Sequence, residues 1–206
     1  MFLFIKRFFD IVLSLLGIIV FSPLLFSVAL LILIFDQGPI VIKQKRIGRY
    51  NRVFKIFKFK TMNSCSTKYN DDNLESKKVT KLGKILRNSS LDELPQLINV
   101  LRGDMSLIGP RPKTPEEIIF ILDTQYEFRH CTRPGLTGLA VIRGRNILTP
   151  IEAYNFDIEY IKKQGILFDL YLLTMSVLVF FSKKVSTIRM NSLSFPIVIF
   201  GETKKV

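Results

Sequence analysis

The sequence predicts a helix-rich α+β fold, with an N-terminal re-entrant membrane helix hairpin, a small cytosolic domain and interfacial amphipathic helices. The first observation is composition: the 206 residues are 48% hydrophobic and nevertheless carry a net charge of +13. The second is one long uncharged segment close to the N-terminus. The third is a series of apolar repeats with helical spacing after residue 80. Together they indicate a protein that embeds in a membrane and also contacts anions.

The first element is the uncharged segment Ile11–Phe35, which is 25 residues long. As a helix it would reach about 38 Å and could cross a hydrocarbon core of about 30 Å. A signal peptide fits poorly, since its apolar core runs only about 7–15 residues. Ser22 and Pro23 lie in the middle, where proline kinks a helix. Basic residues flank both ends and favour the same cytoplasmic side, so a re-entrant hairpin over 1–36 is preferred to a straight span, although true spans also tolerate proline.

The next element is a basic and aromatic segment. Residues 37–70 contain nine Lys or Arg and no Asp or Glu. Cations alternate with aromatic residues from Arg52 to Lys60, and Gly48–Asn51 has the composition of a turn. We expect a short β-hairpin against an anionic membrane surface. Nucleic-acid binding is the alternative for such a segment, but the neighbouring membrane element argues against it, so no nucleic-acid partner is expected.

Helices then dominate the predicted cytosolic domain, residues 37–189, and 190–206 form an unassigned tail. Their boundaries are indicated by capping residues, first-turn prolines and apolar spacing. A last apolar helix over 166–181 contains one acidic residue, which is typical of an interfacial or core-facing helix rather than a lipid span. The predicted helices begin after Thr80, near Asp92, after Thr114, after Thr149 and at Ile166, and Gly103 ends the second.

Adjacent carboxylates at Asp92 and Glu93 are the first candidate site. Ser90 and Glu93 match a capping box, and acidic residues also complement a helix dipole. Pro95 argues against a helix capped at Ser90, because it would then delete an intrahelical hydrogen bond. We therefore expect the helix to begin at or after Asp92. A capping role and a catalytic role for Asp92 both remain open at this point.

Two glycine-proline loops, Gly103–Pro112 and Arg133–Gly138, each hold an arginine. Such loops can present backbone N–H groups and a fixed guanidinium to phosphate oxygens. Either loop alone would be an ordinary tight turn. Beside paired carboxylates, a basic hairpin and a membrane element, they indicate phosphate chemistry at a bilayer.

These motifs, in this order, resemble the bacterial sugar transferase family, whose small monotopic phosphoglycosyl transferases start glycan assembly on undecaprenyl phosphate. The resemblance runs from about Lys6 to about Leu178 and is closest to members that use a UDP-linked diacetamido sugar. It is carried by Lys6–Asp10, Ser22-Pro23, Lys58–Met62, Arg87, Ser90–Gln96 and the two loops. The resemblance implies a protein on the cytoplasmic face of the bacterial inner membrane.

The same resemblance implies a two-step reaction. Asp92 would attack the sugar-proximal phosphorus of a UDP-sugar and release UMP, and undecaprenyl phosphate would then take the phosphosugar from Asp92. Glu93 would assist, and Asp92 and Glu93 would hold Mg²⁺. Anionic lipid and later glycosyltransferases are further candidate partners. The expected phosphate-binding residues are Arg87, Lys60, Arg111 and Arg133.

One segment departs from the family pattern. Leu139, Val141 and Arg143 stand where the family usually has Trp, Gln and Asn, which puts the sugar specificity in doubt. Two alternative functions remain: a non-catalytic membrane scaffold that recruits glycan-assembly enzymes, and a glycosyltransferase that releases UDP instead of UMP. The single histidine, His130, is expected to be a surface residue.

Overall fold

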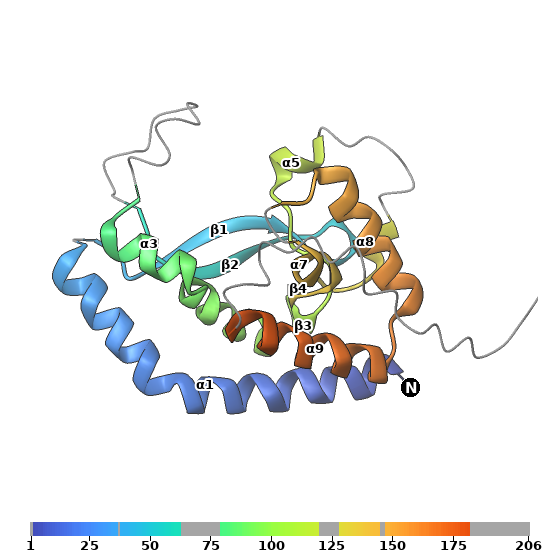
Figure 1. Cartoon of the computed structure of the whole chain (residues 1–206), viewed down its shortest axis with the longest axis horizontal. Helices are drawn as coiled ribbons and strands as arrows, with labels where there is room; N and C mark the ends of the chain where they lie inside the picture. The colour runs from blue at the N-terminus through green and yellow to red at the C-terminus, as the bar shows by residue number, and fades with distance from the viewer. Residues whose placement is uncertain (1, 37, 63–78, 120–127, 145–146, 182–206) are drawn as a thin grey trace, which may run out of the picture.

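The computed structural model of the chain describes residues 2–36, 38–62, 79–119, 128–144 and 147–181. Helices outnumber short strands, so the predicted helix-rich α+β class is confirmed (Figure 1). The predicted tail, residues 190–206, lies outside the described residues. In chain order the elements are α1 (Phe2–Phe35), β1 (Val41–Ile47), η1 (Arg49–Asn51), β2 (Val53–Phe59), α3 (Lys81–Asn88), η2 (Leu91–Gln96), α4 (Leu97–Arg102), β3 (Ser106–Ile108), α5 (Pro115–Ile119), η3 (Phe128–Cys131), β4 (Gly135–Thr137), α7 (Leu139–Arg143), α8 (Pro150–Lys163) and α9 (Ile166–Phe181).

The N-terminal segment is one continuous bent helix, α1, rather than two antiparallel helices. It runs along one side of the domain and then turns toward α3 (Figure 1). Pro23 has no N–H to donate to the carbonyl of Ile19, four residues earlier. The Ser22 hydroxyl donates to that carbonyl at 2.7 Å. Ser22 thus replaces the hydrogen bond that Pro23 removes, which explains how a helix containing proline stays continuous here.

Both ends of α1 contact the same domain. Near its start, Arg7 donates to the carbonyls of Val100 and Leu101 at 2.6 and 2.8 Å, at the C-terminal end of α4. Near its other end, Val28 and Ile32 are buried in a cluster with Phe59 and Leu86, from β2 and α3. The predicted bend is therefore present, and the re-entrant path through a bilayer stays a prediction.

Asp10 and Asp36 lie at the two ends of the apolar segment, where residues that only mark its boundary with water would be exposed, and both are instead buried. Asp10 is buried and accepts hydrogen bonds from the Leu107 N–H at 2.9 Å and the Ser106 hydroxyl at 3.1 Å. Asp36 is also buried, and its carboxylate accepts from the Thr80 hydroxyl at 2.8 Å. A buried carboxylate needs such partners, so both aspartates attach α1 to the domain.

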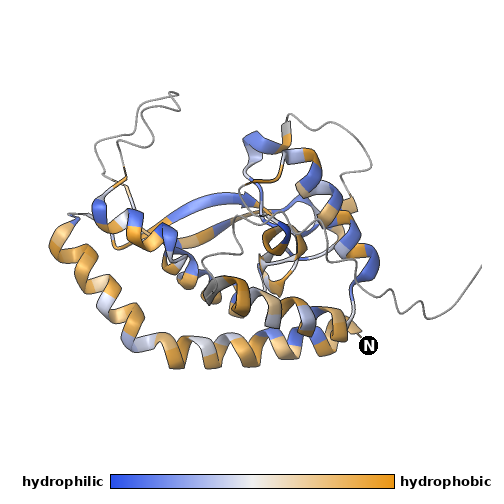
Figure 2. Ribbon diagram, in the orientation of Figure 1, coloured by the Kyte–Doolittle hydropathy of each residue, from blue (hydrophilic) through white to orange (hydrophobic). Residues whose placement is uncertain are grey.

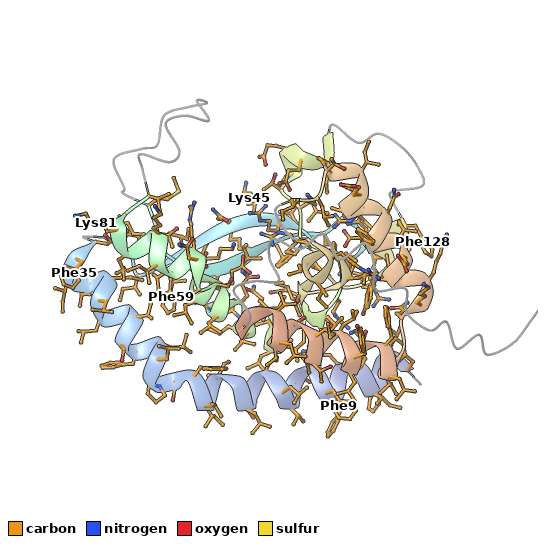
Figure 3. All side chains as sticks on the ribbon, viewed as in Figure 1. Phe9, Phe35, Lys45, Phe59, Lys81 and Phe128 are labelled. Atoms are coloured by element: carbon orange, nitrogen blue, oxygen red, sulfur yellow. The ribbon has the colours of Figure 1, made fainter. Side chains whose placement is uncertain are left out.

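The basic segment forms the predicted hairpin, in which β1 and β2 pair antiparallel with Ile42 opposite Lys58. Tyr50 and Asn51 adopt left-handed backbone angles in the turn. The buried Asn99 amide holds the hairpin on α4, because it accepts from the Phe57 N–H at 3.0 Å and donates to the Lys55 carbonyl at 2.8 Å. Contact between the hairpin and a membrane surface stays a prediction. Figure 3 argues against it, since it shows Lys45 on the side of the molecule remote from Phe9 of α1.

The predicted helix caps are present. Thr80 accepts from the Gly83 N–H at the start of α3, and Thr149 and Glu152 form a capping box at the start of α8. Thr114 and Glu117 bond reciprocally at the start of α5. Gly103, at φ 88°, ends α4 in the left-handed conformation that favours glycine. Local sequence therefore determines these helix boundaries.

The two glycine-proline loops lie side by side as a parallel pair, β3 and β4. The Gly109 N–H donates to the Thr137 carbonyl at 3.0 Å and the Gly135 N–H donates to the Pro110 carbonyl at 2.8 Å. A Cβ on Gly135 would lie 2.2 Å from the Gly109 nitrogen, so only glycine permits this approach. These two N–H groups are consequently used to join the loops.

The main core lies between the hairpin, α4, the β3–β4 pair and helices α7 to α9. Its largest fully buried members include Ile56, Val100, Met105, Tyr160 and Leu172. On α9, Asp169 pairs with Lys6 of α1 and accepts from the Tyr160 hydroxyl at 2.8 Å. Asp169 therefore joins α9 to α1 and α8, and contact of α9 with a membrane interface stays a prediction.

An apolar surface extends along α1 and α9 (Figure 2). Helix α1 is long and apolar enough to cross a membrane, and among its residues only Asp10, Ser14, Val28 and Ile32 are buried. A helix from the core of a soluble protein would bury most of its apolar side chains, whereas these are exposed. The exposed large side chains of this surface include Phe4, Phe8, Val20, Phe26, Ile34 and Phe35 of α1 and Leu167, Leu170 and Leu178 of α9.

Candidate active site

The paired carboxylates lie in the short 3₁₀ helix η2, between α3 and α4. Ser90 precedes it with a left-handed backbone, φ 54°, and its side chain makes no capping hydrogen bond. The capping-box explanation of Ser90 and Glu93 is therefore wrong, and the α-helix begins only at Leu97, after Pro95. Left-handed conformations at residues other than glycine cost free energy and cluster at functional sites. Asp92 is buried, with 8% of its surface exposed.

Glu93 holds two cations from separate parts of the chain. Its Oε1 lies 3.0 Å from the Lys58 Nζ on β2 and 3.8 Å from an Arg111 Nη2 in the loop after β3. The Lys58 and Glu93 side chains are only 16% and 15% exposed. An ion pair this sheltered from water is screened less than a surface pair. The hairpin and the Arg111 loop therefore meet at η2.

A pocket opens at this meeting point. Its lining includes two carboxylates, Glu93 of η2 and Glu117 of α5. The cations of its wall come from the hairpin and from the loop between β3 and α5. The complete lining consists of Arg46, Ile56, Lys58, Glu93, Gln96, Arg111, Pro112, Lys113, Glu117, Gly135 and Leu136.

A buried ion pair fixes the loop that carries Arg111. Arg129 of η3 and Asp157 of α8 lie 2.5 Å apart, with side chains 2% and 3% exposed. Arg129 also donates to the Arg111 carbonyl at 2.6 Å and stacks on the Tyr154 ring, 4.6 Å from its centroid. Helix α8 thus determines the backbone position of Arg111 through Arg129.

Of the four expected phosphate-binding residues, the structure places Arg111 in the pocket. Lys60 is buried and donates to the Asp36 carbonyl at 2.8 Å, at the end of α1. Arg87 donates to the Thr61 hydroxyl at 3.0 Å, and Arg133 donates to the Gly103 carbonyl at 2.9 Å. Burial lowers the pKa of Arg133, and Arg7 and Arg49 add to the effect. Phosphate binding by Lys60, Arg87 and Arg133 stays a prediction.

Lys58, Arg46 and Lys113 belong to the pocket and were not singled out from the sequence. Strand alternation places Arg46 and Ile42 on one face of β1, and antiparallel pairing brings Ile42 opposite Lys58. The register of the predicted hairpin could therefore have indicated that Lys58 shares a face with Arg46. No local pattern indicated Lys113, whose place follows from the bond between the Ile47 N–H and the Lys113 carbonyl, 2.9 Å.

Comparison with known proteins decides the family. Residues 1–183 match the family described as "Bacterial sugar transferase". The chain belongs to the bacterial sugar transferase family. This match covers α1, the pocket and α9, so the helix and the site belong to one family unit in this sugar transferase.

Three relatives illustrate the family. The sugar transferase is 35% identical over 189 residues to "Exopolysaccharide production protein ExoY" of Sinorhizobium fredii, covering 84% of this chain and 83% of that protein. It is 42% identical over 146 residues to a "UDP-N-acetylgalactosamine-undecaprenyl-phosphate N-acetylgalactosaminephosphotransferase" of Aeromonas hydrophila, covering 68% and 34%. It is 36% identical over 191 residues to the "UDP-glucose:undecaprenyl-phosphate glucose-1-phosphate transferase" of Escherichia coli, covering 88% and 41%. The chain thus spans less than half of the last two proteins.

The segment expected to depart from the family pattern lies on α7, outside the pocket lining. Leu139 and Ile142 are buried in the core, and the Arg143 guanidinium lies 5.9 Å from the centroid of the Phe156 ring on α8. A leucine at position 139 therefore fills core volume in this sugar transferase. The effect of this segment on sugar specificity stays a prediction.

Proposed function

We propose that this bacterial sugar transferase moves a phosphosugar from a UDP-sugar to undecaprenyl phosphate and releases UMP. The observation that carries the proposal is the placement of Glu93 in a cation-lined pocket, with Asp92 buried beside it. Two relatives are named as undecaprenyl-phosphate sugar phosphotransferases with UDP-sugar donors. Those names support the substrates proposed here. The sugars that they print are N-acetylgalactosamine and glucose, so transfer of a diacetamido sugar stays a prediction.

The proposed reaction has two displacements at one phosphorus. In the first, an Asp92 carboxylate oxygen attacks the sugar-proximal phosphorus, and the bond from that phosphorus to the bridging oxygen of the diphosphate breaks. The electron pair leaves with UMP, and Asp92 carries the phosphosugar. In the second, an oxygen of undecaprenyl phosphate attacks the same phosphorus and restores the Asp92 carboxylate. Covalent catalysis of this kind divides one difficult step into two easier ones.

The cations around Glu93 would neutralise the negative charge of the substrate phosphates. Phosphoryl transfer depends mainly on positioning and electrostatic stabilisation. Lys58 and Arg111 already lie within 3.0 and 3.8 Å of one carboxylate oxygen, so they are held together before a substrate enters. Arg111 can bind a phosphate through a planar fork, and Lys58 acts as a point charge. Glu93 therefore maintains the cation pair between turnovers.

Mg²⁺ is the proposed metal. Among the described residues no group of three or more His, Cys, Asp or Glu could hold a metal ion. Mg²⁺ is usually held by one or two carboxylates together with substrate phosphates, and the Asp92–Glu93 pair fits that incomplete donor set. The ion would supply charge neutralisation on the diphosphate. Binding of the donor would complete its coordination.

We propose that the apolar surface of α1 and α9 holds the site at a bilayer. Exposed apolar area of this extent is typical of a membrane-contacting surface. Both ends of α1 are fixed to one domain by Arg7 and by Val28 and Ile32. We propose that a helix held in this way enters and leaves one face of the membrane, the cytoplasmic face. Anionic lipid and later glycosyltransferases remain proposed partners.

The test is UMP release by full-length protein with undecaprenyl phosphate and a panel of UDP-sugars. Asp92→Asn should abolish release, since the amide is a poor nucleophile, while Glu93→Gln should reduce it. Lys45→Gln is the control, because Lys45 is exposed and is absent from the pocket lining. Normal turnover by Asp92→Asn would sink the mechanism. Release of UDP would favour the glycosyltransferase alternative, and lipid binding with no released nucleotide would favour the scaffold.

A further inference from the structure

Arg46 lies in the pocket with an incomplete set of partners. One Nη donates to the Gln44 side chain at 3.3 Å, and the other lies 3.9 Å from a Glu117 carboxylate oxygen. Its Nε is buried and has no hydrogen-bond partner among the described residues. A buried donor without a partner costs free energy. Burial also lowers the pKa of Arg46, so this cation lacks the solvation and pairing it would have in water.

Lys113 is the second pocket cation that is partly buried. Its ammonium lies 5.9 Å from the centroid of the Tyr154 ring. Burial lowers the pKa of Lys113, and the neighbouring cations Arg129 and Arg111 lower it further, against the effect of Glu117. The bond between the Ile47 N–H and the Lys113 carbonyl holds this residue beside β1, the strand that carries Arg46. Two partly buried cations therefore converge on one side of the pocket.

Charge in the pocket is unbalanced. Its described lining contains four cations, Arg46, Lys58, Arg111 and Lys113, and two carboxylates, Glu93 and Glu117. The excess is two positive charges in a confined space, which matches the charge of a UDP-sugar diphosphate and that of UMP near neutral pH. An entering phosphate would provide acceptors for the unsatisfied guanidinium and relieve the repulsion among the cations.

The positions of Arg46 and Lys113 favour one of two possible sources of phosphate, the nucleotide donor or the acceptor lipid. Arg46 lies 3.9 Å from a carboxylate oxygen of Glu117 on α5, and Lys113 is near enough to Glu117 for its charge to act on the lysine pKa. Figure 1 shows α5 on the opposite side of the molecule from α1. An acceptor lipid would approach from the apolar surface of α1 and α9, whereas a soluble nucleotide can enter from the side of α5. The geometry therefore favours the nucleotide.

We propose that Arg46 and Lys113 bind the nucleotide-side phosphate of the donor, the group that leaves as the phosphate of UMP. This inference rests on the proposed function and adds residues to its substrate site. The Arg46 N–H groups and the Lys113 ammonium donate to that phosphate, while Lys58 and Arg111 serve the phosphate beside Asp92. The pocket then has two phosphate positions, one near the nucleophile and one near α5.

The test compares the binding of UMP and of uridine to full-length protein in nanodiscs by titration calorimetry. Uridine lacks the phosphate, so the ratio of the two affinities isolates its contribution. Arg46→Gln and Lys113→Met should each lower UMP affinity about tenfold, the loss of a charge-assisted hydrogen bond, and leave uridine affinity unchanged. Lys45→Gln should change neither value. Wild-type UMP-to-uridine ratios in both pocket variants would overturn the proposal.

Two further arms separate this inference from its premise. The first measures turnover by Asp92→Asn, which removes the nucleophile and leaves all four pocket cations in place. If Asp92→Asn turned over normally, the proposed mechanism would fail while the affinity ratio still decided the role of Arg46 and Lys113. Titration with undecaprenyl phosphate should give equal affinities for wild type and Arg46→Gln. A loss confined to that lipid would assign the position to the acceptor and overturn the proposal.

Discussion

Replacing Asp157 with asparagine tests how the fold supports the pocket. The substitution keeps the size of the side chain and one acceptor oxygen, and removes the negative charge. It leaves the Arg129 guanidinium, whose side chain is 2% exposed, without a counter-charge. Breaking a buried ion pair from one side costs about 3–5 kcal/mol of unfolding free energy. In a chain of 206 residues, each kcal/mol corresponds to roughly 2–4 °C in Tm, so we expect a loss of roughly 6–20 °C.

The assay is thermal unfolding of full-length protein in detergent, followed by circular dichroism, since the chain contains no tryptophan. The matched control is the double variant Arg129→Met/Asp157→Leu, which removes both charges. Replacing a buried pair by apolar residues is often neutral or stabilising, so the double variant should regain most of the lost Tm. It should stay impaired in UMP release, because the Arg111 carbonyl has lost its donor. A loss below about 3 °C in Asp157→Asn, or additive losses in the double variant, would refute this reasoning.

Three other predictions follow from contacts described above. Asp10→Ala should lower the unfolding free energy by about 2–4 kcal/mol, because two buried donors of β3 lose their acceptor; a change under 1 kcal/mol would contradict this. Burial, with a smaller effect of the Arg129 charge, lowers the pKa of His130 from 6.5 to about 4. As pH drops from about 6.5 to about 4, the unfolded chain binds a proton at His130 before the folded chain does, so the unfolding free energy should fall over that range. His130→Gln should flatten that part of a curve of Tm against pH. Single cysteines placed at the N-terminus and at the C-terminus, in a chain with both native cysteines replaced, should react with an impermeant maleimide from the cytoplasmic side only, and labelling of either from the periplasm would show a true span.

The sequence predicted those parts of the fold that local chemistry determines. Thr80, Thr149 and Gly103 begin or end helices as expected, because capping depends on neighbours within one turn. A bend in α1, the helix that contains Pro23, was expected because proline lacks an N–H. The continuity of α1 did not follow, since it depends on the Ser22 hydroxyl reaching the Ile19 carbonyl.

The sequence did not reveal contacts between residues that are far apart along the chain. Asp10 looked like a boundary residue because its acceptor role depends on β3, 97 residues further along the chain. Arg129 and Asp157 showed no motif, although they fix the Arg111 backbone. Lys60 and Lys58 are both cations at one strand end, and only the packing of η2 against β2 places Lys58 beside Glu93. Electrostatic partners that are distant in sequence therefore define the pocket.

The most direct test of the central claim is to incubate the protein with a UDP-sugar donor and no undecaprenyl phosphate, quench it with acid, and examine its peptides by mass spectrometry. The account predicts one phosphosugar attached to the peptide that contains Asp92, its disappearance when undecaprenyl phosphate is added before the quench, and its absence from Asp92→Asn. A turning-over enzyme with an unmodified Asp92 peptide under these conditions would contradict the account.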